Sequence, residues 1–208
     1  MARRLLAIDT ATTACSVALF EDGALIASEY AEIGRGHAER LIPAIAGLPG
    51  HGKASEILVN CGPGSFTGVR IGISAAKALA LAWKANIHGY SCLALIAAQA
   101  RAQLGTALPV CVAMVAGHGE YFLQNFGASG DALDPLSSLP PDKAANQIAA
   151  NVIAGSGAAE LSKIAGIKDH FLILPNAADI SLMASDMMQL PPKPIYGRKP
   201  DAEPAKDS

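Results

Sequence analysis

The stretch Cys61-Gly-Pro-Gly-Ser-Phe-Thr-Gly-Val-Arg-Ile-Gly72 indicates how this chain folds. It follows a short apolar run and opens a long alanine-rich segment that reaches about residue 82. This order predicts a strand, a glycine-proline turn and a helix over residues 65–82. Gly62 and Gly64 permit close backbone approaches that a side chain would block. Ser65 is placed to accept a hydrogen bond from the first free N–H groups of the helix. We therefore interpret Gly62, Gly64 and Ser65 as a structural glycine turn.

The start of a helix after a glycine turn is able to bind phosphate, because it presents unpaired N–H groups. Two well-known motifs of this type are nevertheless excluded. The Gly-Lys-Ser/Thr ending of a Walker loop is missing, and Lys77 lies well down the helix. Pro63 and Thr67 stand where a hydrolase nucleophile elbow requires glycine. The pattern alone predicts a tight turn onto a helix.

Small residues recur every four positions on that helix, at Gly68, Gly72 and Ala76, so they share one face. Such a face allows another element to approach closely. It packs either against the protein's own sheet or against a partner chain, and the spacing does not separate the two. We expect the apolar stripe through Val69 and Ile73 to face the protein's own sheet.

The composition limits the classes of function. Of the 208 residues, 51% are apolar, 5% are aromatic and 16% are charged, and the formal net charge is −2. A core of small aliphatic side chains is expected, and a basic nucleic-acid surface is not. The four cysteines form no C-x-x-C pair, which favours reduced thiols in a cytosolic protein. Cys15 and Cys111 are expected in strands as small core residues.

No membrane segment is predicted. Arg3–Arg4 precede an apolar run that resembles a signal peptide, but Asp9 ends this run too early. Residues 102–119 lack charges, but Gln103 and Pro109 make them a poor membrane helix. A cytoplasmic protein is expected.

The chain shows two similar halves. A strand, a turn and a return strand open near residue 5 and again near residue 110, and helices and strands alternate after each. This order predicts two related α/β lobes, 1–104 and a smaller 105–190, followed by a partly disordered tail, 191–208. In the first lobe we expect a helix over 37–46 and strands over 5–9, 15–20, 57–60 and 87–90.

Candidate catalytic residues are few. A strand that ends in Asp9-Thr10 before a turn is typical of the phosphate hairpin of actin-like ATPases, but the turn Thr10–Ala14 has no glycine. Asp9 is therefore interpreted as a structural carboxylate. The five histidines form no i,i+4 pair for a metal ion. His37, after Gly36 at a helix start, is expected to be a partly exposed capping residue.

Five segments in order carry a resemblance to a known family: Leu6–Thr10, Cys15–Leu19, His37–Pro43, Gly62–Gly72 and, at the far end, Pro194–Arg198. Together they resemble the bacterial threonylcarbamoyladenosine biosynthesis family TsaB, historically grouped with glycoproteases. The match is ordered through about the first hundred residues, and the Gly62–Gly72 segment is the most specific part of it. Gly197 replaces the leucine of the family's closing Pro-x-Tyr-Leu-Arg motif.

The resemblance implies a two-lobed actin-like (ribonuclease H-like) fold with duplicated lobes. It implies a non-catalytic subunit without catalytic residues, metal or cofactor. Such a subunit pairs with a homologous catalytic subunit and a small ATPase to place threonylcarbamoyl on N6 of adenosine-37 in tRNA, and contacts tRNA only through the complex. The helices 37–46 and 65–82 would carry the partner interface. The residues expected in that interface are His37, Arg40, Leu41, Gly68, Gly72 and Ala76.

The second half departs from the family pattern. Val115-Ala-Gly117 stands where the family carries Asp-Ala-Arg, followed by the matching Gly119-Glu120. The loss of a carboxylate and a guanidinium lowers the expectation of nucleotide binding between the lobes. Two alternatives remain: an enzyme, either a glycoprotease-type metallopeptidase or an ATP-dependent phosphotransferase, and a homodimeric binding module.

Overall fold

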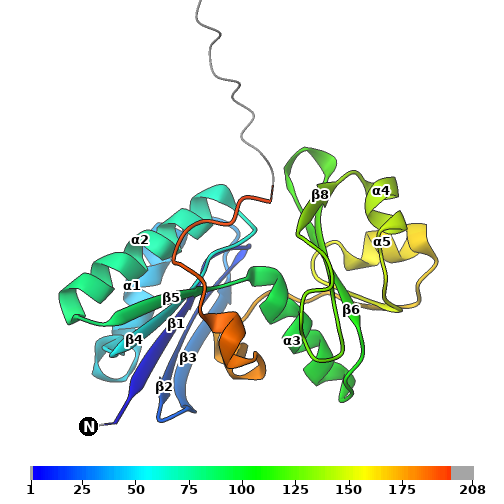
Figure 1. Cartoon of the computed structure of the whole chain (residues 1–208). Coiled ribbons are helices and arrows are strands. Elements are labelled where there is room, and N and C mark those ends of the chain that lie inside the picture. The colour runs from blue at the N-terminus through cyan, green and yellow to red at the C-terminus, as the bar shows by residue number, and fades with distance from the viewer. Residues whose placement is uncertain (1, 198–208) are drawn as a thin grey trace, which may run out of the picture.

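The computed structural model describes residues 2–197 and holds two five-stranded sheets, one in each half of the chain (Figure 1). The first sheet has the order β3-β2-β1-β4-β5. Strands β1, β2 and β3 run antiparallel, and β4 and β5 run parallel to β1. The bounds are β1 (Arg4–Asp9), β2 (Ala14–Glu21), β3 (Ala24–Glu32), β4 (Glu56–Asn60) and β5 (Asn86–Tyr90).

The second sheet repeats this topology with shorter strands. Its order, β8-β7-β6-β9-β10, again places the first strand in the centre, an antiparallel meander on one side and parallel strands on the other. The bounds are β6 (Val110–Val115), β7 (Tyr121–Phe126), β8 (Ser137–Leu139), β9 (Val152–Ala154) and β10 (Asp169–Phe171). The predicted pair of related α/β lobes is confirmed.

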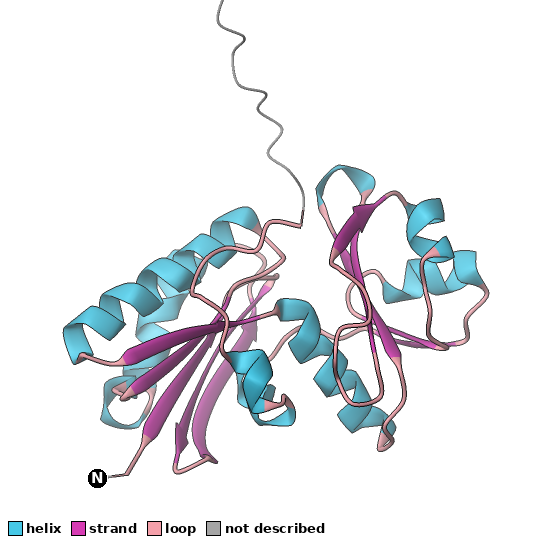
Figure 2. Ribbon diagram, in the orientation of Figure 1, coloured by secondary structure: helices cyan, strands magenta, loops and turns pink. Residues whose placement is uncertain are grey.

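Helices form layers around the two sheets (Figures 1 and 2). Helices α1 (His37–Gly47) and α2 (Phe66–Trp83) cover one face of the first sheet. Helices α4 (Pro141–Asn146) and α5 (Ala158–Ala165) cover the outer side of the second sheet. Helix α3 (Cys92–Leu104) lies between the sheets, and every residue from Cys92 to Ala100 is buried. A helix that is apolar on all sides is expected in such a central position.

Alternation along the strands divides the buried side chains between two cores. The larger core includes Cys15 of β2, helix α3 and the side chains of the second sheet that face α3. The smaller core lies between the second sheet and helices α4 and α5, and includes Cys111 of β6. Burial raises the pKa of the Cys15 thiol to about 11 and that of Cys111 to about 12. Both cysteines are buried and unpaired, so their predicted role as small core residues is confirmed.

The end of the chain returns to the first lobe. The 3-10 helices Ala177–Leu182 and Ser185–Met188 pack on the first sheet, and the Ala177 N–H donates to Ser16 Oγ at 3.0 Å. Leu190 then exchanges two backbone hydrogen bonds with Gly89 of β5. Residues 177–190, which the sequence prediction assigned to the second lobe, thus pack on the first lobe. Of the tail predicted over 191–208, residues 198–208 lie outside the described residues.

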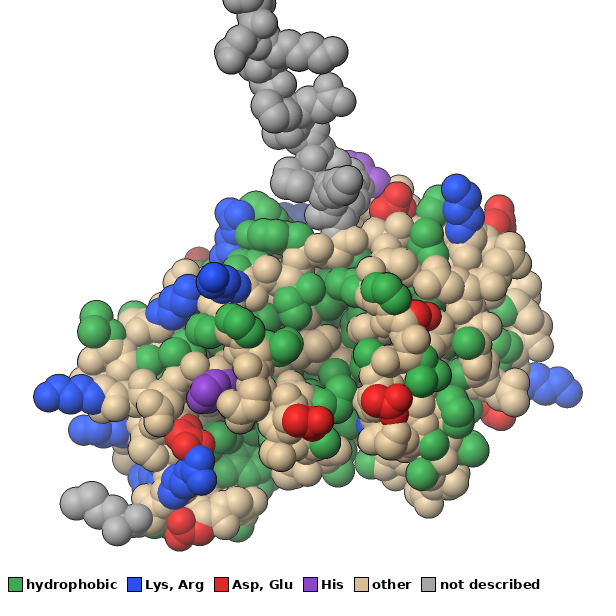
Figure 3. All heavy atoms as spheres, in the orientation of Figure 1, with side chains coloured by type: hydrophobic (Ala, Val, Ile, Leu, Met, Phe, Trp, Pro, Cys, Tyr) green, Lys and Arg blue, Asp and Glu red, His purple; other side chains and the backbone are tan. Residues whose placement is uncertain are grey.

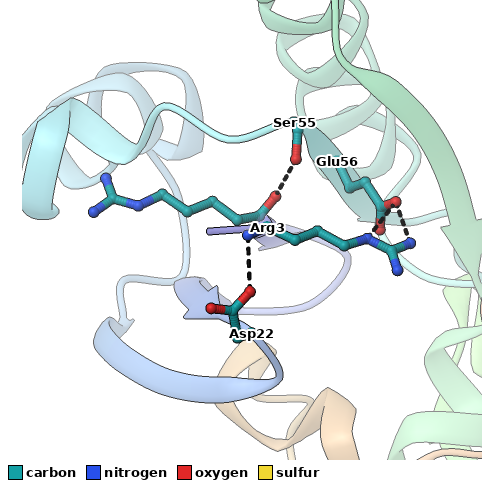
Figure 4. Close-up of polar contacts among 5 residues, drawn as sticks. Arg3, Asp22, Ser55 and Glu56 are labelled. Atoms are coloured by element: carbon teal, nitrogen blue, oxygen red, sulfur yellow. Dashed lines mark hydrogen bonds and ion pairs between the residues drawn. The ribbon is translucent and has the colours of Figure 1, made fainter. Parts of the chain in front are cut away.

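Arg3 and Arg4 connect the start of β1 to neighbouring elements of the first sheet (Figure 4). The Arg3 backbone N–H donates to Asp22 Oδ1 at 2.9 Å, and its guanidinium Nε donates to Glu56 Oε1 at 2.9 Å. Ser55 Oγ donates to the Arg4 carbonyl at 3.1 Å. These contacts join the β2–β3 turn and the start of β4 to β1. Because the contacts are exposed, they add little to the stability of the fold.

Candidate functional site

The glycine-proline loop lies directly on the turn between β1 and β2. The Ser65 N–H donates to the Ala11 carbonyl at 2.7 Å, and a Cβ on Gly64 would lie 2.1 Å from the same oxygen. Thr10 Oγ1 donates to the Gly68 carbonyl at 2.7 Å, and a Cβ on Gly68 would lie 2.1 Å from the Thr10 carbonyl oxygen. Side chains at these two positions would separate the loop from the turn. The glycines serve a contact within the chain.

Ser65 caps helix α2, as the sequence predicts. Its Oγ accepts a hydrogen bond from the Gly68 N–H at 3.2 Å. Gly62 has φ 95°, a left-handed conformation that favours glycine. A Cβ on Gly62 would also lie 3.1 Å from the Ile195 carbonyl of the returning chain. The loop is therefore held between the β1–β2 turn and the end of the chain.

The small-residue stripe of α2 faces the protein's own sheet. Gly68 and Gly72 are buried, and Ala76 is fully buried. A Cβ on Gly72 would lie 2.5 Å from Thr10 Oγ1 and 3.5 Å from Val59 Cγ2. The sequence left open whether the stripe packs on the protein's own sheet or on a partner chain, and the structure shows packing on the sheet. The expectation that these three residues contact a partner is wrong, because β1 and β4 occupy the space in front of them.

Helix α1 corrects two further interface predictions. His37 is only 6% exposed, and its Nε2 lies 3.2 Å from the Ala14 carbonyl oxygen. It is thus a buried residue that ties the helix start to β2, and the expectation of a partly exposed cap is wrong. Leu41 is 1% exposed and belongs to the core. Arg40 alone among the predicted contacts of α1 is exposed, and it pairs with Glu29 of β3.

Asp9 is enclosed by hydrogen-bond donors from three elements. Its Oδ1 accepts from the Ala11 N–H at 3.0 Å, and its Oδ2 accepts from Asn60 Nδ2 at 2.5 Å and from the Tyr90 hydroxyl at 3.1 Å. Burial raises the pKa of the Asp9 carboxyl to about 6, although the Asn60, Ala11 and Tyr90 donors oppose this rise. Both oxygens are occupied within the chain, which agrees with a structural carboxylate.

A cleft of about 990 Å³ separates the two lobes beside this network. Its described lining carries the charged side chains Arg35 and Glu39. Val115, where the family pattern has aspartate, lies at the cleft and is 56% exposed. Within residues 2–197, no group of His, Cys, Asp or Glu is arranged to hold a metal ion. The cleft thus lies between the glycine loop at the start of α2 and the end of β6, which contribute Ser65 and Val115 to its lining.

Large apolar side chains stand outward on α1 and α2, which contact each other on the first lobe. Leu81 of α2 is 84% exposed and Ile42 of α1 is 50% exposed. We call the exposed sides of α1 and α2, which carry Ile42 and Leu81, the outer helix face. Arg70 and Lys77 are also exposed on α2, and Figure 3 shows basic side chains gathering over this helix. The sequence argument missed Leu81, although its position outside the buried Val69–Ile73 stripe was a usable signal.

A second group missed from the sequence lies where the returning chain crosses α2. The Arg70 guanidinium stacks on the Phe66 ring with 3.6 Å from its carbon to the ring centroid, and it donates to the Tyr196 hydroxyl at 2.9 and 3.1 Å. Gly197 follows, where a Cβ would lie 2.5 Å from the Phe122 ring of β7. This contact explains why glycine fits where the family motif has leucine. Arg198 of that motif lies outside the described residues.

Comparison with known proteins identifies the family. The model of the family "TsaD: tRNA N6-adenosine threonylcarbamoyltransferase" matches residues 31–186. The solved structure of YeaZ from Pseudomonas aeruginosa superposes with a TM-score of 0.79 at 30% identity, covering 93% of this chain and 99% of that one. The tRNA threonylcarbamoyladenosine biosynthesis protein TsaB of Escherichia coli is 41% identical over 124 residues. The chain belongs to the TsaB family. Its Bacillus subtilis member is 35% identical over 111 residues.

These alignments are concentrated in part of each protein. The match with the E. coli TsaB covers 57% of this chain and 53% of that protein, and the B. subtilis match covers 51% and 48%. The chain therefore spans about half the length of these curated TsaB relatives. The structural match extends over both lobes, so the TsaB fold includes the short second lobe. In the described part of the chain, no helix is both long and apolar enough to cross a membrane.

Proposed function

We propose that this chain is a non-catalytic accessory subunit in the synthesis of N6-threonylcarbamoyladenosine at position 37 of tRNA. It binds and orders the homologous catalytic subunit in the cytoplasm, and a small ATPase subunit acts in the same complex. One observation carries the proposal: the residues that would serve phosphate or metal in an actin-like enzyme are engaged within the chain. Both Asp9 oxygens accept internal hydrogen bonds, and the glycine loop donates to the Ala11 carbonyl.

The outer helix face supports a role in binding a partner. Leu81 and Ile42 are exposed to 84% and 50%, on two helices that contact each other. An exposed apolar patch of this kind is typical of a protein contact site, and we propose that the exposed sides of α1 and α2 form one. Helix α2 contains no acidic residue, and Arg70 and Lys77 flank the apolar positions. A partner surface with apolar and acidic side chains would complement this face.

Reconstitution with the catalytic homologue tests the proposal. Adding this chain should raise the formation of threonylcarbamoyladenosine in tRNA, measured by nucleoside mass spectrometry. The purified chain alone should neither hydrolyse ATP nor cleave glycoproteins. Deletion of its gene should lower the same modification in the cell. Unchanged modification in the deletion strain, without a second copy of the gene, would reject the proposal.

A pair of variants tests the surface. Leu81→Arg should reduce binding to the catalytic subunit by at least about tenfold, because a charged group replaces an apolar contact. Leu172→Arg is the matched control, since Leu172 is 77% exposed in the second lobe, away from α1 and α2. Both variants should melt near the wild-type temperature. Equal binding by Leu81→Arg and the control would place the partner on another surface.

A further inference from the structure

A cavity of about 530 Å³ opens on the face of the first sheet that α1 and α2 leave uncovered. In the sheet register Leu5 lies opposite Phe20 and Glu56, and Leu58 lies opposite His88, so these five residues share one face. All five line the cavity, which we call the sheet cavity. Among the described residues, none lines both the sheet cavity and the cleft between the lobes. The sheet cavity is therefore a separate site.

The returning chain forms the other wall of the sheet cavity. The 3-10 helices Ala177–Leu182 and Ser185–Met188 cross this face of the sheet (Figure 1), and Ile180 and Met188 add apolar side chains to the lining. Figure 3 shows apolar side chains recessed between acidic, basic and histidine side chains on this side of the first lobe. Small-molecule sites commonly have this volume and a mostly apolar wall with a few polar groups. The sheet cavity thus suits an organic ligand with an apolar body.

The charged rim of the sheet cavity favours a cation. Arg3, Asp22 and Glu56 line it (Figure 4), so two carboxylates stand against one guanidinium. The Arg3 Nε donates to Glu56 Oε1 at 2.9 Å, and this ion pair balances the charge of both side chains. Asp22 Oδ1 accepts the Arg3 backbone N–H at 2.9 Å, and within residues 2–197 no hydrogen bond reaches Asp22 Oδ2. The exposed Asp22 carboxylate therefore keeps its charge and one oxygen for a ligand.

Three neutral polar side chains also line the sheet cavity. They are His88 of β5 and Ser181 and Ser185 of the returning chain. In the described part of the chain, none of these three side chains has a hydrogen-bond partner. They are able to bond to a polar group of a ligand without breaking a contact of the fold.

We propose that the sheet cavity binds a small cationic amphiphile, a molecule with an aromatic or aliphatic body and a protonated amine. The apolar body lies between the first sheet and the returning chain, and the amine pairs with the Asp22 carboxylate. An anionic ligand would instead meet two carboxylates, while the guanidinium of Arg3 is already engaged by Glu56. The site lies on the opposite side of the first sheet from the outer helix face, so it does not depend on the proposed accessory function.

Three ligands that share an indole body test the charge preference. Tryptamine ends in an ammonium group, tryptophol in a hydroxyl and indole-3-propionate in a carboxylate. Each is titrated into the isotope-labelled full chain, and binding is followed by amide chemical shifts. Tryptamine should bind at least about threefold more tightly than tryptophol, which is the scale of an exposed ion pair, and at least about tenfold more tightly than indole-3-propionate. Shifts should occur at Gly23, Ile57 and Ser181, which line the sheet cavity.

A pair of conservative variants tests the role of Asp22. Asp22→Asn should abolish the preference for tryptamine over tryptophol and leave the affinity for tryptophol unchanged. Asparagine tolerates the left-handed backbone at this position, where φ is 50°, and keeps an oxygen for the Arg3 N–H. Asp186→Asn is the matched control, because Asp186 is an exposed carboxylate on the same returning chain but does not line the sheet cavity. This control should keep the full preference.

A cavity-filling variant tests the location. Ser185→Trp should weaken the binding of all three ligands at least about tenfold, and it should melt near the wild-type temperature because Ser185 is exposed. Equal affinities for the three ligands, or a preference for tryptamine that survives Asp22→Asn, would overturn the proposal. Chemical shifts confined to the cleft between the lobes would also overturn it. So would the absence of any shift at about 10 mM tryptamine, a concentration above the dissociation constant expected for a ligand of this size.

Discussion

Replacing Gly68 by alanine should destabilise the chain, even though alanine is the better helix former. The added Cβ would lie 2.1 Å from the Thr10 carbonyl oxygen, and this neighbour is backbone that cannot rotate away. Overpacking of this kind costs about 1–3 kcal/mol. A shift of the helix would also weaken the buried Thr10–Gly68 hydrogen bond, worth about 1 kcal/mol. The gain in helix propensity offsets at most about 1 kcal/mol.

The net loss in the free energy of unfolding is therefore about 2 kcal/mol, or about 4–8 °C in melting temperature for a chain of this size. Urea unfolding followed by circular dichroism measures it. Gly47→Ala is the matched control, because Gly47 is also helical and a Cβ there meets nothing within 4 Å. The control should keep or raise the stability. A Gly68→Ala protein as stable as wild type would refute the argument that the glycine exists for close contact with the turn.

Two other perturbations test the same region. Ala76→Arg should prevent folding, since Ala76 is fully buried and an unpaired buried charge costs several kcal/mol. The control Ala78→Arg, on the exposed side of α2, should melt near the wild-type temperature. Thermal melts followed by circular dichroism compare the two variants, and a folded Ala76→Arg protein would contradict the packing of α2 on the sheet. The pKa of Asp9 is raised to about 6 from 3.8, so the folded state binds its proton more tightly than the unfolded state. Stability from this group is full below about pH 4 and is lost as pH rises through about 6. Wild type should therefore gain about 1 kcal/mol relative to Asp9→Asn between pH 7 and pH 5, measured by urea unfolding at each pH, and a difference that does not change with pH would show that Asp9 does not titrate there.

The sequence was sufficient for the architecture because the first lobe follows local rules. The glycine loop and the Ser65 cap each specify one step of the chain, and the structure has these steps in the predicted order. The second lobe repeats the same order, which made its topology predictable despite its short strands. The return of residues 177–190 to the first sheet was not predictable, because two 3-10 helices carry no periodic pattern.

The partner residues were harder to predict than the fold. A stripe of glycine and alanine has the same spacing whether it contacts a partner or the protein's own sheet. The positions of Gly68, Gly72 and Ala76 in the sequence therefore could not decide between these two contacts. His37 and Leu41 were similarly ambiguous, since a residue at a helix start or on an apolar face is buried only if the neighbouring strand lies there. Ala14 of β2 provides that neighbour for His37, a long-range contact that local sequence does not encode.

The contacts of the glycine loop within the chain also determine how α2 exposes its outer side. A phosphate or hydrated metal ion at the β1–β2 turn would require free N–H groups and a free carboxylate oxygen. Here the Ser65 N–H donates to Ala11, and Asp9 accepts three internal hydrogen bonds. The same contacts hold the start of α2 against β1. Further along the helix, the small residues Gly72 and Ala76 allow α2 to pack closely on the sheet. A helix held along its whole inner side presents its outer side in one position. We therefore infer that the contacts around Asp9 and Ser65 also preorganise the outer helix face for the proposed partner.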